Sequence, residues 1–173
     1  MKIRLAGIVK ESVVDGPGLR YVVFAQGCPH RCRNCHNPET WDLEGGELKD
    51  VEEIVRDIEK NPLLRGVTLS GGEPFLQAEA MAYLAEEVKK RNLNVVVYTG
   101  YTWEELQEMA REQEGVKKLL ELADYVVDGP YVEELRDLHL PFRGSSNQRF
   151  IDVRATMAAG KVVEKEFEPW PSW

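Results

Sequence analysis

The sequence predicts an α/β fold in which about five or six parallel strands form an open or partial (β/α) barrel. Short runs of β-branched and aromatic residues alternate with segments whose apolar residues recur at helical spacing. This alternation is typical of right-handed βαβ units around a parallel sheet. The 173 residues are too few for a closed eight-stranded barrel, which takes about 250 residues.

The first part of the chain is expected to hold two strands and one helix. Residues 1–10 predict a short strand or an extended lead-in, and residues 19–25 a buried strand rich in β-branched and aromatic residues. Residues 13–18 between them are rich in turn formers, and residues 41–46 are expected to form a loop. The helix that follows has an apolar stripe consisting of Val51, Ile54, Val55 and Ile58.

The second part repeats strand and helix. Residues 66–70, 94–99 and 124–128 predict short strands, and each is followed by a glycine. Residues 78–91 are expected to be helical. Two helices are expected between the last two of these strands, one with a capping box of Thr102 and Glu105 and one with the apolar residues Val116, Leu119, Leu120 and Leu122.

The pattern weakens after residue 140. Residues 143–148 form a polar loop by composition, and residues 149–153 predict a last strand. We expect residues 1–173 to form a single domain, in which residues 154–173 are a C-terminal extension. The proline-rich end of this extension disfavours a helix.

Composition excludes some classes of protein. The net charge of −8 argues against a nucleic-acid-binding surface, which would be basic. No apolar run approaches the roughly 20 residues that a membrane helix needs, and the first residues do not resemble a signal peptide. We therefore expect a cytoplasmic protein that binds neither nucleic acid nor a membrane, in a compartment that keeps thiols reduced.

The three cysteines of the chain, Cys28, Cys32 and Cys35, form a C-x3-C-x2-C run just past the expected strand 19–25. Disulfide pairing would leave one of the three unpaired. Three thiolates on a [4Fe–4S] cluster would bind three irons and leave the fourth open to a small molecule. Ligands in parallel α/β proteins gather at this end of the strands.

A zinc site is the alternative from another class. His36 follows Cys35 directly and would complete a Cys3His set in a zinc-binding interaction module. Ligands so close in sequence cannot easily surround one tetrahedral ion, which disfavours zinc. An electron-transfer ferredoxin would need a fourth cysteine, and the chain has three.

A second turn lies at the same end of the next expected strand. Residues 70–74 read Ser-Gly-Gly-Glu-Pro. Glycines let a ligand approach the backbone closely, and the carboxylate of Glu73 is suited to an ammonium group. The cysteine run and this turn are therefore expected to face one cavity.

Together, the two motifs resemble those of the radical S-adenosylmethionine (SAM) enzymes. Further stretches at 14–20, 24–28 and 35–41 look like the glycyl-radical activating enzymes, and stretches at 98–102, 127–131 and 143–149 resemble the branch that activates the anaerobic (class III) ribonucleoside-triphosphate reductase. The resemblance spans about residues 8–153. It implies a partial barrel of the radical SAM type.

The resemblance implies that Cys28, Cys32 and Cys35 hold a [4Fe–4S] cluster, and that SAM binds the open iron through its amino and carboxylate groups. An electron from the cluster would split SAM, and the resulting 5′-deoxyadenosyl radical would take a hydrogen atom from one glycine of the reductase large subunit. The electron donor would be of the flavodoxin or ferredoxin type. Implied SAM neighbours are Asn34, Cys35, His36, Ser70, Gly71, Gly72, Glu73, Thr99 and Gly100.

Two positions depart from the pattern. Many radical SAM enzymes carry an aromatic residue where this chain has Asn34, and His36-Asn37 is closer to the activator of pyruvate formate-lyase. An activator of pyruvate formate-lyase or of a related glycyl radical enzyme is therefore the second candidate. A radical SAM enzyme for a small molecule, such as a deazaguanine-ring former, is a third.

Each of three further segments has two possible roles. Residues 15–18 and 143–148 are either turns that close the domain or contacts to the partner's glycine loop or the SAM carboxylate. The tail with Trp170 and Trp173 is either a clasp on the domain or a docking element.

Overall fold

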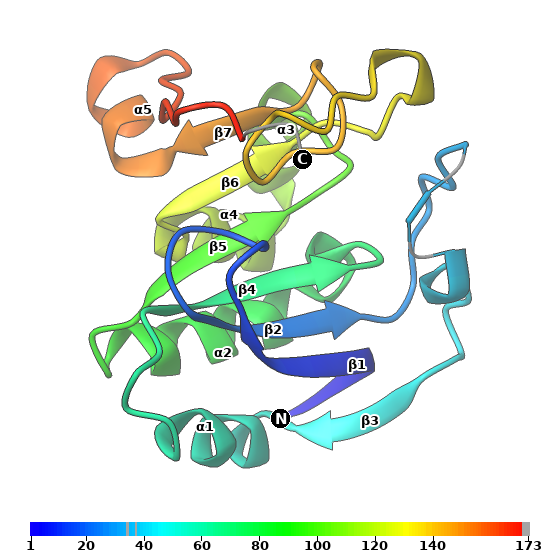
Figure 1. Cartoon of the computed structure of the whole chain (residues 1–173). Coiled ribbons are helices and arrows are strands. Elements are labelled where there is room, and N and C mark those ends of the chain that lie inside the picture. The colour runs from blue at the N-terminus through cyan, green and yellow to red at the C-terminus, as the bar shows by residue number, and fades with distance from the viewer. Residues whose placement is uncertain (34, 37, 171–173) are drawn as a thin grey trace.

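The computed structural model is a mixed α/β structure built on one sheet (Figure 1). It describes residues 1–33, 35–36 and 38–170. Across these residues, the strand order is β3-β1-β2-β4-β5-β6-β7. The strands are β1 Lys2–Ser12, β2 Arg20–Ala25, β3 Glu47–Asp50, β4 Gly66–Gly71, β5 Asn94–Tyr98, β6 Tyr125–Asp128 and β7 Arg149–Asp152.

The middle of the sheet is parallel and its flanks are antiparallel. β2, β4, β5 and β6 are parallel neighbours, whereas β1, β3 and β7 each run antiparallel to the strand beside them. The α/β fold is confirmed, but the parallel part is smaller than the expected five or six strands. One reason is that residues 13–19, between β1 and β2, are too few for a crossover, which takes about a dozen residues or more.

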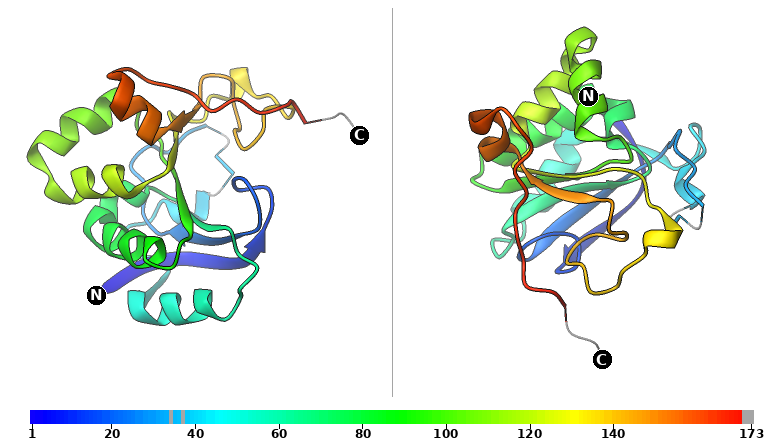
Figure 2. Two further views of the ribbon diagram at one scale, coloured as in Figure 1. Left: turned by 90° about the vertical axis from the view of Figure 1, so that its left-hand side faces the viewer. Right: turned by 90° about the horizontal axis from the view of Figure 1, so that it is seen from above.

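Helices cover one face of the sheet. Figure 2 shows α1 to α4 together on one side, and α5 lies beside β7. The apolar stripe predicted for α1 is buried, and the capping box predicted for α3 is formed by both of its hydrogen bonds. The helices are α1 Val51–Glu59, α2 Ala78–Lys89, α3 Trp103–Glu112, α4 Glu114–Leu122 and α5 Val153–Ala159, with short 3-10 turns η1 Pro38–Thr40, η2 Pro74–Gln77 and η3 Glu133–Leu135.

Two elements were not predicted. β3 has the polar sequence Glu-Leu-Lys-Asp and forms because the long β1 offers it an open edge, where it pairs from Lys2 to Leu5. α5 begins at Val153 and continues into the segment 154–173 that was expected to be only an extension. It begins with a side-chain cap, in which Asp152 accepts a hydrogen bond from the N–H of Ala155.

Successive side chains along the strands point to opposite faces of the sheet. Tyr21, Val23, Leu69 and Val97 pack into the main core beneath the helices. Their neighbours in sequence point to the opposite face, where Val96, Val127 and Phe150 form a smaller cluster with partly buried Tyr98, Phe142 and Phe167. The opposite face is therefore only partly filled by side chains, and the functional site lies there.

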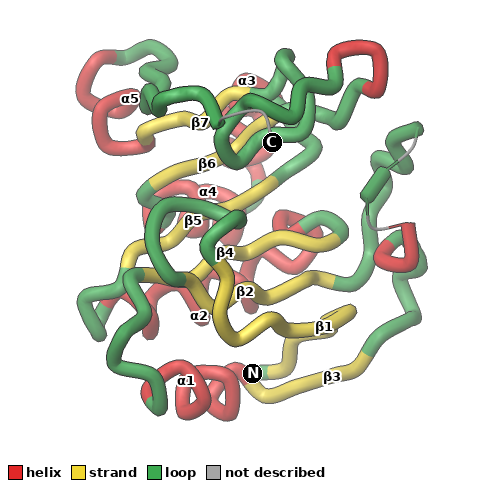
Figure 3. Tube along the Cα trace, viewed as in Figure 1, coloured by secondary structure: helices red, strands yellow, loops and turns green. Residues whose placement is uncertain are grey.

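The carboxyl ends of the parallel strands point to one edge of the sheet, where long loops gather (Figure 3). The cysteine loop, residues 28–35, leaves β2 at this edge. In the part of the chain that the structure describes, no helix is long and apolar enough to cross a bilayer.

Candidate radical SAM site

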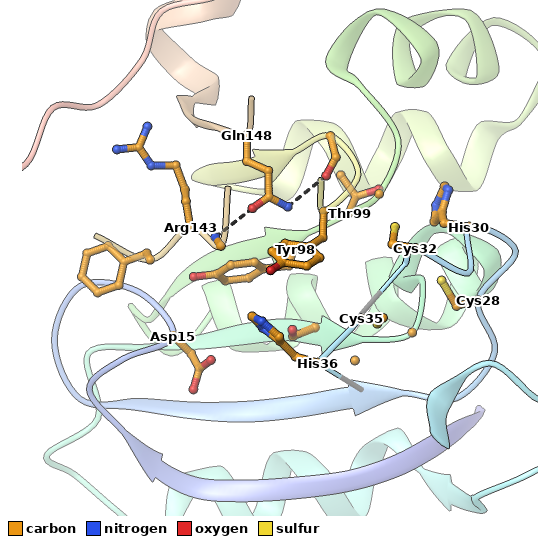
Figure 4. Close-up of a pocket in the computed structure, with 18 of the residues that line it drawn as sticks. Asp15, Cys28, His30, Cys32, Cys35, His36, Tyr98, Thr99, Arg143 and Gln148 are labelled. Atoms are coloured by element: carbon orange, nitrogen blue, oxygen red, sulfur yellow. Dashed lines mark hydrogen bonds between the residues drawn. The ribbon is translucent and has the colours of Figure 1, made fainter. Parts of the chain in front are cut away.

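A cavity of about 510 Å³ lies on the helix-free face at the carboxyl ends of the parallel strands (Figure 4). Phe24 of β2, Gly71 of β4 and Tyr98 of β5 line it, as does Gly129 directly after β6. Its volume is in the usual range for a site that takes a small molecule, roughly 300–1,000 Å³. The cavity is therefore large enough for a small-molecule cosubstrate.

The three cysteines line one end of this cavity. Cys28, Cys32 and Cys35 are each partly exposed thiols, and Figure 4 shows them on the side opposite Asp15 and Arg143. The N–H of Cys28 donates to the carbonyl of Trp41 at 3.3 Å, and that of Cys35 to the carbonyl of Cys32 at 3.1 Å. These two backbone bonds hold the chain at Cys28 and Cys35, and all three cysteines line the same cavity.

The environment of Cys28 has opposing effects on its thiol. Burial raises the pKa of Cys28, the N–H groups of His30 and Arg31 lower it, and the negative charge of Glu73 raises it. The net pKa is raised. A bound metal would stabilise the thiolate of Cys28 and so counteract the increase in its pKa.

Gly71 and Gly72 lie where the end of β4 packs against the chain that leads into the cysteine loop. Gly71 has a φ of +94°, and a Cβ there would lie 2.5 Å from the backbone nitrogen of Ala25. A Cβ on Gly72 would lie 2.3 Å from the carbonyl oxygen of Gly27. The glycines therefore serve the packing of β4 against the chain that leads to Cys28, and they also leave their backbone bare towards the cavity.

Glu73 is placed differently from the expectation. Its side chain is fully buried and absent from the cavity lining. Oε1 accepts from Nε2 of His30 at 2.6 Å and from the N–H of Gly100 at 2.8 Å. The hydroxyl of Thr99 and the N–H of Phe75 also donate to the carboxylate. Protein donors therefore occupy the Glu73 oxygens behind the cavity wall, and the expected contact of Glu73 with the SAM ammonium stays a prediction.

Seven other expected SAM neighbours lie on the cavity wall: Cys35, His36, Ser70, Gly71, Gly72, Thr99 and Gly100. The ring of His36 lies 4.9 Å from that of Tyr131, between centroids. Asn34, the remaining expected neighbour, lies outside the described residues, as do Asn37 and Trp173.

The other end of the cavity is formed by residues distant in sequence. Asp15, Phe142, Arg143 and Trp170 line it. Gln148 holds its shape, since its side-chain oxygen accepts from the N–H of Gly144 at 2.9 Å and its amide donates to the carbonyl of Gly129 at 3.1 Å (Figure 4). In the described part of the chain, the buried Nε of Arg143 has no hydrogen-bond partner.

Several lining residues were missed by the sequence analysis. Tyr98 and Gly129 follow from a rule that was available, because both stand at carboxyl ends of parallel strands. His30 carried no such indication, Tyr131 was only part of the family-like stretch 127–131, and Trp170 was named only as part of a clasp or docking element. Trp170 reaches the cavity because its ring packs on Phe142, with 5.3 Å between the ring centroids, so the chain at Trp170 lies over this face.

The thiols of Cys28, Cys32 and Cys35 are the donors available for a cluster at this end of the cavity. Three thiols at one end of a cavity suit a [4Fe–4S] cluster, in which each sulfur binds a different iron. Within the described residues, no group of three His, Cys, Asp or Glu side chains is arranged around a single metal ion. The thiols therefore fit the cluster.

Similarity to known proteins agrees with this chemistry. Residues 14–151 match the sequence model of the family described as "4Fe-4S single cluster domain". This match covers well over half of the chain, which therefore belongs to that class of iron–sulfur proteins.

Individual relatives show to which family of iron–sulfur proteins the chain belongs. The anaerobic ribonucleoside-triphosphate reductase-activating protein of Vibrio cholerae serotype O1 is 36% identical over 144 residues, which cover 79% of this chain and 89% of that protein. The chain belongs to the family of anaerobic ribonucleoside-triphosphate reductase-activating proteins. The family expected from the sequence motifs is thus confirmed.

Two further proteins are similar. The pyruvate formate-lyase 1-activating enzyme of Escherichia coli (strain K12) is 34% identical over 168 residues, or 92% of this chain and 65% of that enzyme. The crystal structure of QueE from Escherichia coli matches 59% of this chain and 54% of that chain, with a TM-score of 0.47 and 20% identity.

Proposed function

We propose that this protein is a radical SAM activase that reductively cleaves SAM at a [4Fe–4S] cluster and generates a glycyl radical on the anaerobic ribonucleoside-triphosphate reductase. One observation carries the proposal: three thiols and two bare glycine backbones line one cavity at the carboxyl ends of parallel strands. The relatives named as activating proteins of that reductase support the choice of partner.

Cys28, Cys32 and Cys35 would hold the cluster. When bound, it supplies the electron that splits SAM into methionine and a 5′-deoxyadenosyl radical. The other tasks of the protein are to bind and orient the cosubstrate and to exclude water. Hence the site needs no nucleophile and no carboxylate pair.

The methionine end of SAM would lie along Ser70, Gly71 and Gly72, whose backbone faces the cavity beside the thiols. Thr99 and Gly100 extend this wall from the next strand. With Glu73 occupied by protein donors, backbone carbonyls of this wall are the groups suited to the ammonium. This assignment is an alternative to the carboxylate contact expected from the sequence.

The end of the cavity with Asp15, Arg143 and Trp170 would receive the glycine loop of the partner or the SAM carboxylate. The unpartnered Nε of Arg143 supports an anionic or carbonyl contact there. We propose that a flavodoxin or ferredoxin-type protein donates the electron. We also propose that residues 1–173 form one cytoplasmic domain, an open partial barrel with helices outside and the cavity inside.

The test is anaerobic reconstitution with iron and sulfide, followed by dithionite, SAM and chromatography for 5′-deoxyadenosine. We expect the nucleoside from the wild type and none from Cys32→Ala, with Arg33→Ala as a matched control that retains activity. Iron and sulfide near four each per chain are expected for one such cluster. Uptake of one zinc without sulfide would overturn the proposal.

The second candidate is an activator of pyruvate formate-lyase, which the 34% identity over 92% of this chain favours. Electron paramagnetic resonance separates the two. The loaded protein is offered each purified partner with SAM and reductant. A glycyl radical signal on the ribonucleotide reductase alone supports the first proposal, and a signal on the lyase alone supports the second.

A further inference from the structure

His30 stands inside the cysteine loop, but its side chain points inward. The side chain is 16% exposed, and its Nε2 lies 2.6 Å from Oε1 of the fully buried Glu73. A carboxylate only accepts hydrogen bonds, so Nε2 is the donor. His30 thus anchors the cysteine loop to a residue of the neighbouring β4 turn.

The surroundings of this imidazole are shaped for it. A Cβ on Gly100 would lie 2.4 Å from Cδ2 of His30, so the ring occupies space that any side chain at position 100 would need. The ring of Tyr101 meets that of His30 edge to face, with 4.5 Å between centroids. Three neighbours, Glu73, Gly100 and Tyr101, therefore form a seat for the ring.

Two other side-chain contacts of the cysteine loop involve exposed arginines. Arg33 pairs with Glu134 at 3.3 Å, but the two side chains are 78% and 67% exposed. Arg31 lies over the ring of Trp41 at 5.7 Å. Exposed ion pairs contribute little to stability, whereas a buried hydrogen bond to a charged group contributes more. The seat of His30 is therefore a stronger side-chain anchor for this loop than the exposed ion pair of Arg33.

We propose that His30 is a positioning residue, which acts through Glu73 to hold Cys28 and Cys32 facing the cavity. The consequence for cluster retention rests on the proposed function. Groups that orient metal ligands without touching the metal commonly change metal affinity roughly 10- to 100-fold when they are removed. His30 holds the main chain between two ligands, which is a role of that kind.

The test compares His30→Ala, His30→Gln and the matched surface control Arg33→Ala. The first readout needs no iron: the rates at which iodoacetamide alkylates Cys28 and Cys32 in the metal-free protein, followed by mass spectrometry. We expect His30→Ala to react at least about fivefold faster, as loss of one buried hydrogen bond loosens the loop. His30→Gln, which keeps an N–H donor at similar reach, and Arg33→Ala are expected to match the wild type.

The second readout is the rate at which a chelator removes iron from the reconstituted protein. We expect iron loss roughly tenfold faster in His30→Ala, with an unchanged circular dichroism spectrum. Because His30 acts through Glu73, adding His30→Ala to Glu73→Ala, in which the His30 ring has lost its acceptor, is expected to cause no further increase.

Wild-type rates of alkylation and iron loss in His30→Ala would overturn the inference, and additive effects in the double variant would overturn the route through Glu73. If His30→Ala fails to fold, His30→Gln decides, because rapid alkylation there would exclude the donor role. A wild type that takes up no iron and sulfide would refute the proposed function instead, while the metal-free alkylation rates still decide the role of His30.

Discussion

Two buried side chains, Arg20 and Glu73, connect β2, β4 and β5, one at each end of these strands. We call the contacts of each side chain a tie. At the amino ends, Arg20 donates to Thr68 Oγ1 at 2.7 Å and to the carbonyls of Pro17, Val67 and Asn94 at 2.9 to 3.3 Å. At the carboxyl ends, Glu73 accepts from the segments that follow β2 and β5. Both side chains have no exposed surface.

The two ties differ in what they hold. The partners of Arg20 are three backbone carbonyls and one hydroxyl, so this tie fixes the scaffold. Burial lowers the pKa of Arg20 to about 10, which leaves it charged at neutral pH. Glu73 instead binds a side chain of the cysteine loop, so this tie reaches the site. A buried polar side chain thus stabilises the scaffold at one end of the sheet and anchors the cysteine loop at the other.

The largest effect on stability is expected at the amino-end tie. Arg20→Leu removes a buried charged donor from three backbone carbonyls, those of Val67, Pro17 and Asn94, and we expect the free energy of unfolding to fall by roughly 3–5 kcal/mol. Urea unfolding followed by circular dichroism measures it. The exposed Arg33→Ala is the control, with a change within about 0.5 kcal/mol.

Arg20→Leu also tests whether the contacts at the amino ends of the strands affect the cysteine loop. If Arg20 serves only the scaffold, folded Arg20→Leu protein should alkylate Cys28 and Cys32 at the wild-type rate in the cold without denaturant. Faster alkylation would mean that both ends of the sheet control the cysteine loop. A loss of less than about 1 kcal/mol in the urea experiment would mean that these carbonyls find other donors.

An intermediate effect is expected where the ring of His30 needs space. Gly100→Ala would place a Cβ 2.4 Å from that ring, and we expect a cost of about 1–3 kcal/mol from the overlap. Because the ring must leave its seat, alkylation of Cys28 and Cys32 should rise as in His30→Ala.

The control for Gly100→Ala is Gly7→Ala in β1. Nothing lies within 4 Å of the position that its Cβ would take, so a change within about 0.5 kcal/mol is expected. If Gly100→Ala behaved like this control in urea and in alkylation, the ring of His30 would not depend on the space at position 100.

The smallest effect concerns the helix-covered face, outside both ties. The Asp57 carboxylate of α1 accepts from the hydroxyl of Tyr21 at 2.8 Å and from Lys10 at 3.3 Å. Burial alone would raise the pKa of Asp57, but the hydrogen bonds from Tyr21 and Lys10 outweigh it and lower that pKa.

Because the pKa of Asp57 is lower in the folded state, its contribution is present above the unfolded value of about 4 and is lost as the pH falls below it. Asp57→Asn should cost less than about 1 kcal/mol at pH 7. Urea unfolding from pH 7 down to pH 3 should show a flatter acid limb for the variant. Parallel curves for both proteins would contradict the linkage.

Much of the scaffold could be predicted from the sequence. The apolar stripe of α1, the capping box of Thr102 and Glu105, and the strand runs that end in glycine depend on residues close in sequence, and the structure contains them. The polar strand β3 was missed because it depends on the open edge of β1. The direction of β7 was missed because pairing with β6, not its own residues, decides it.

The sequence by itself determined the cysteine spacing, the Gly-Gly turn and the strands that bring both to one edge, because these are local patterns. Only the tertiary structure decided that Glu73 faces inward, since its oxygens are filled by donors from the segments after β2 and β5. His30 acquired a candidate role for the same reason, because its partner lies 43 residues away. Buried polar groups must find partners, and which partners they find depends on how distant segments pack.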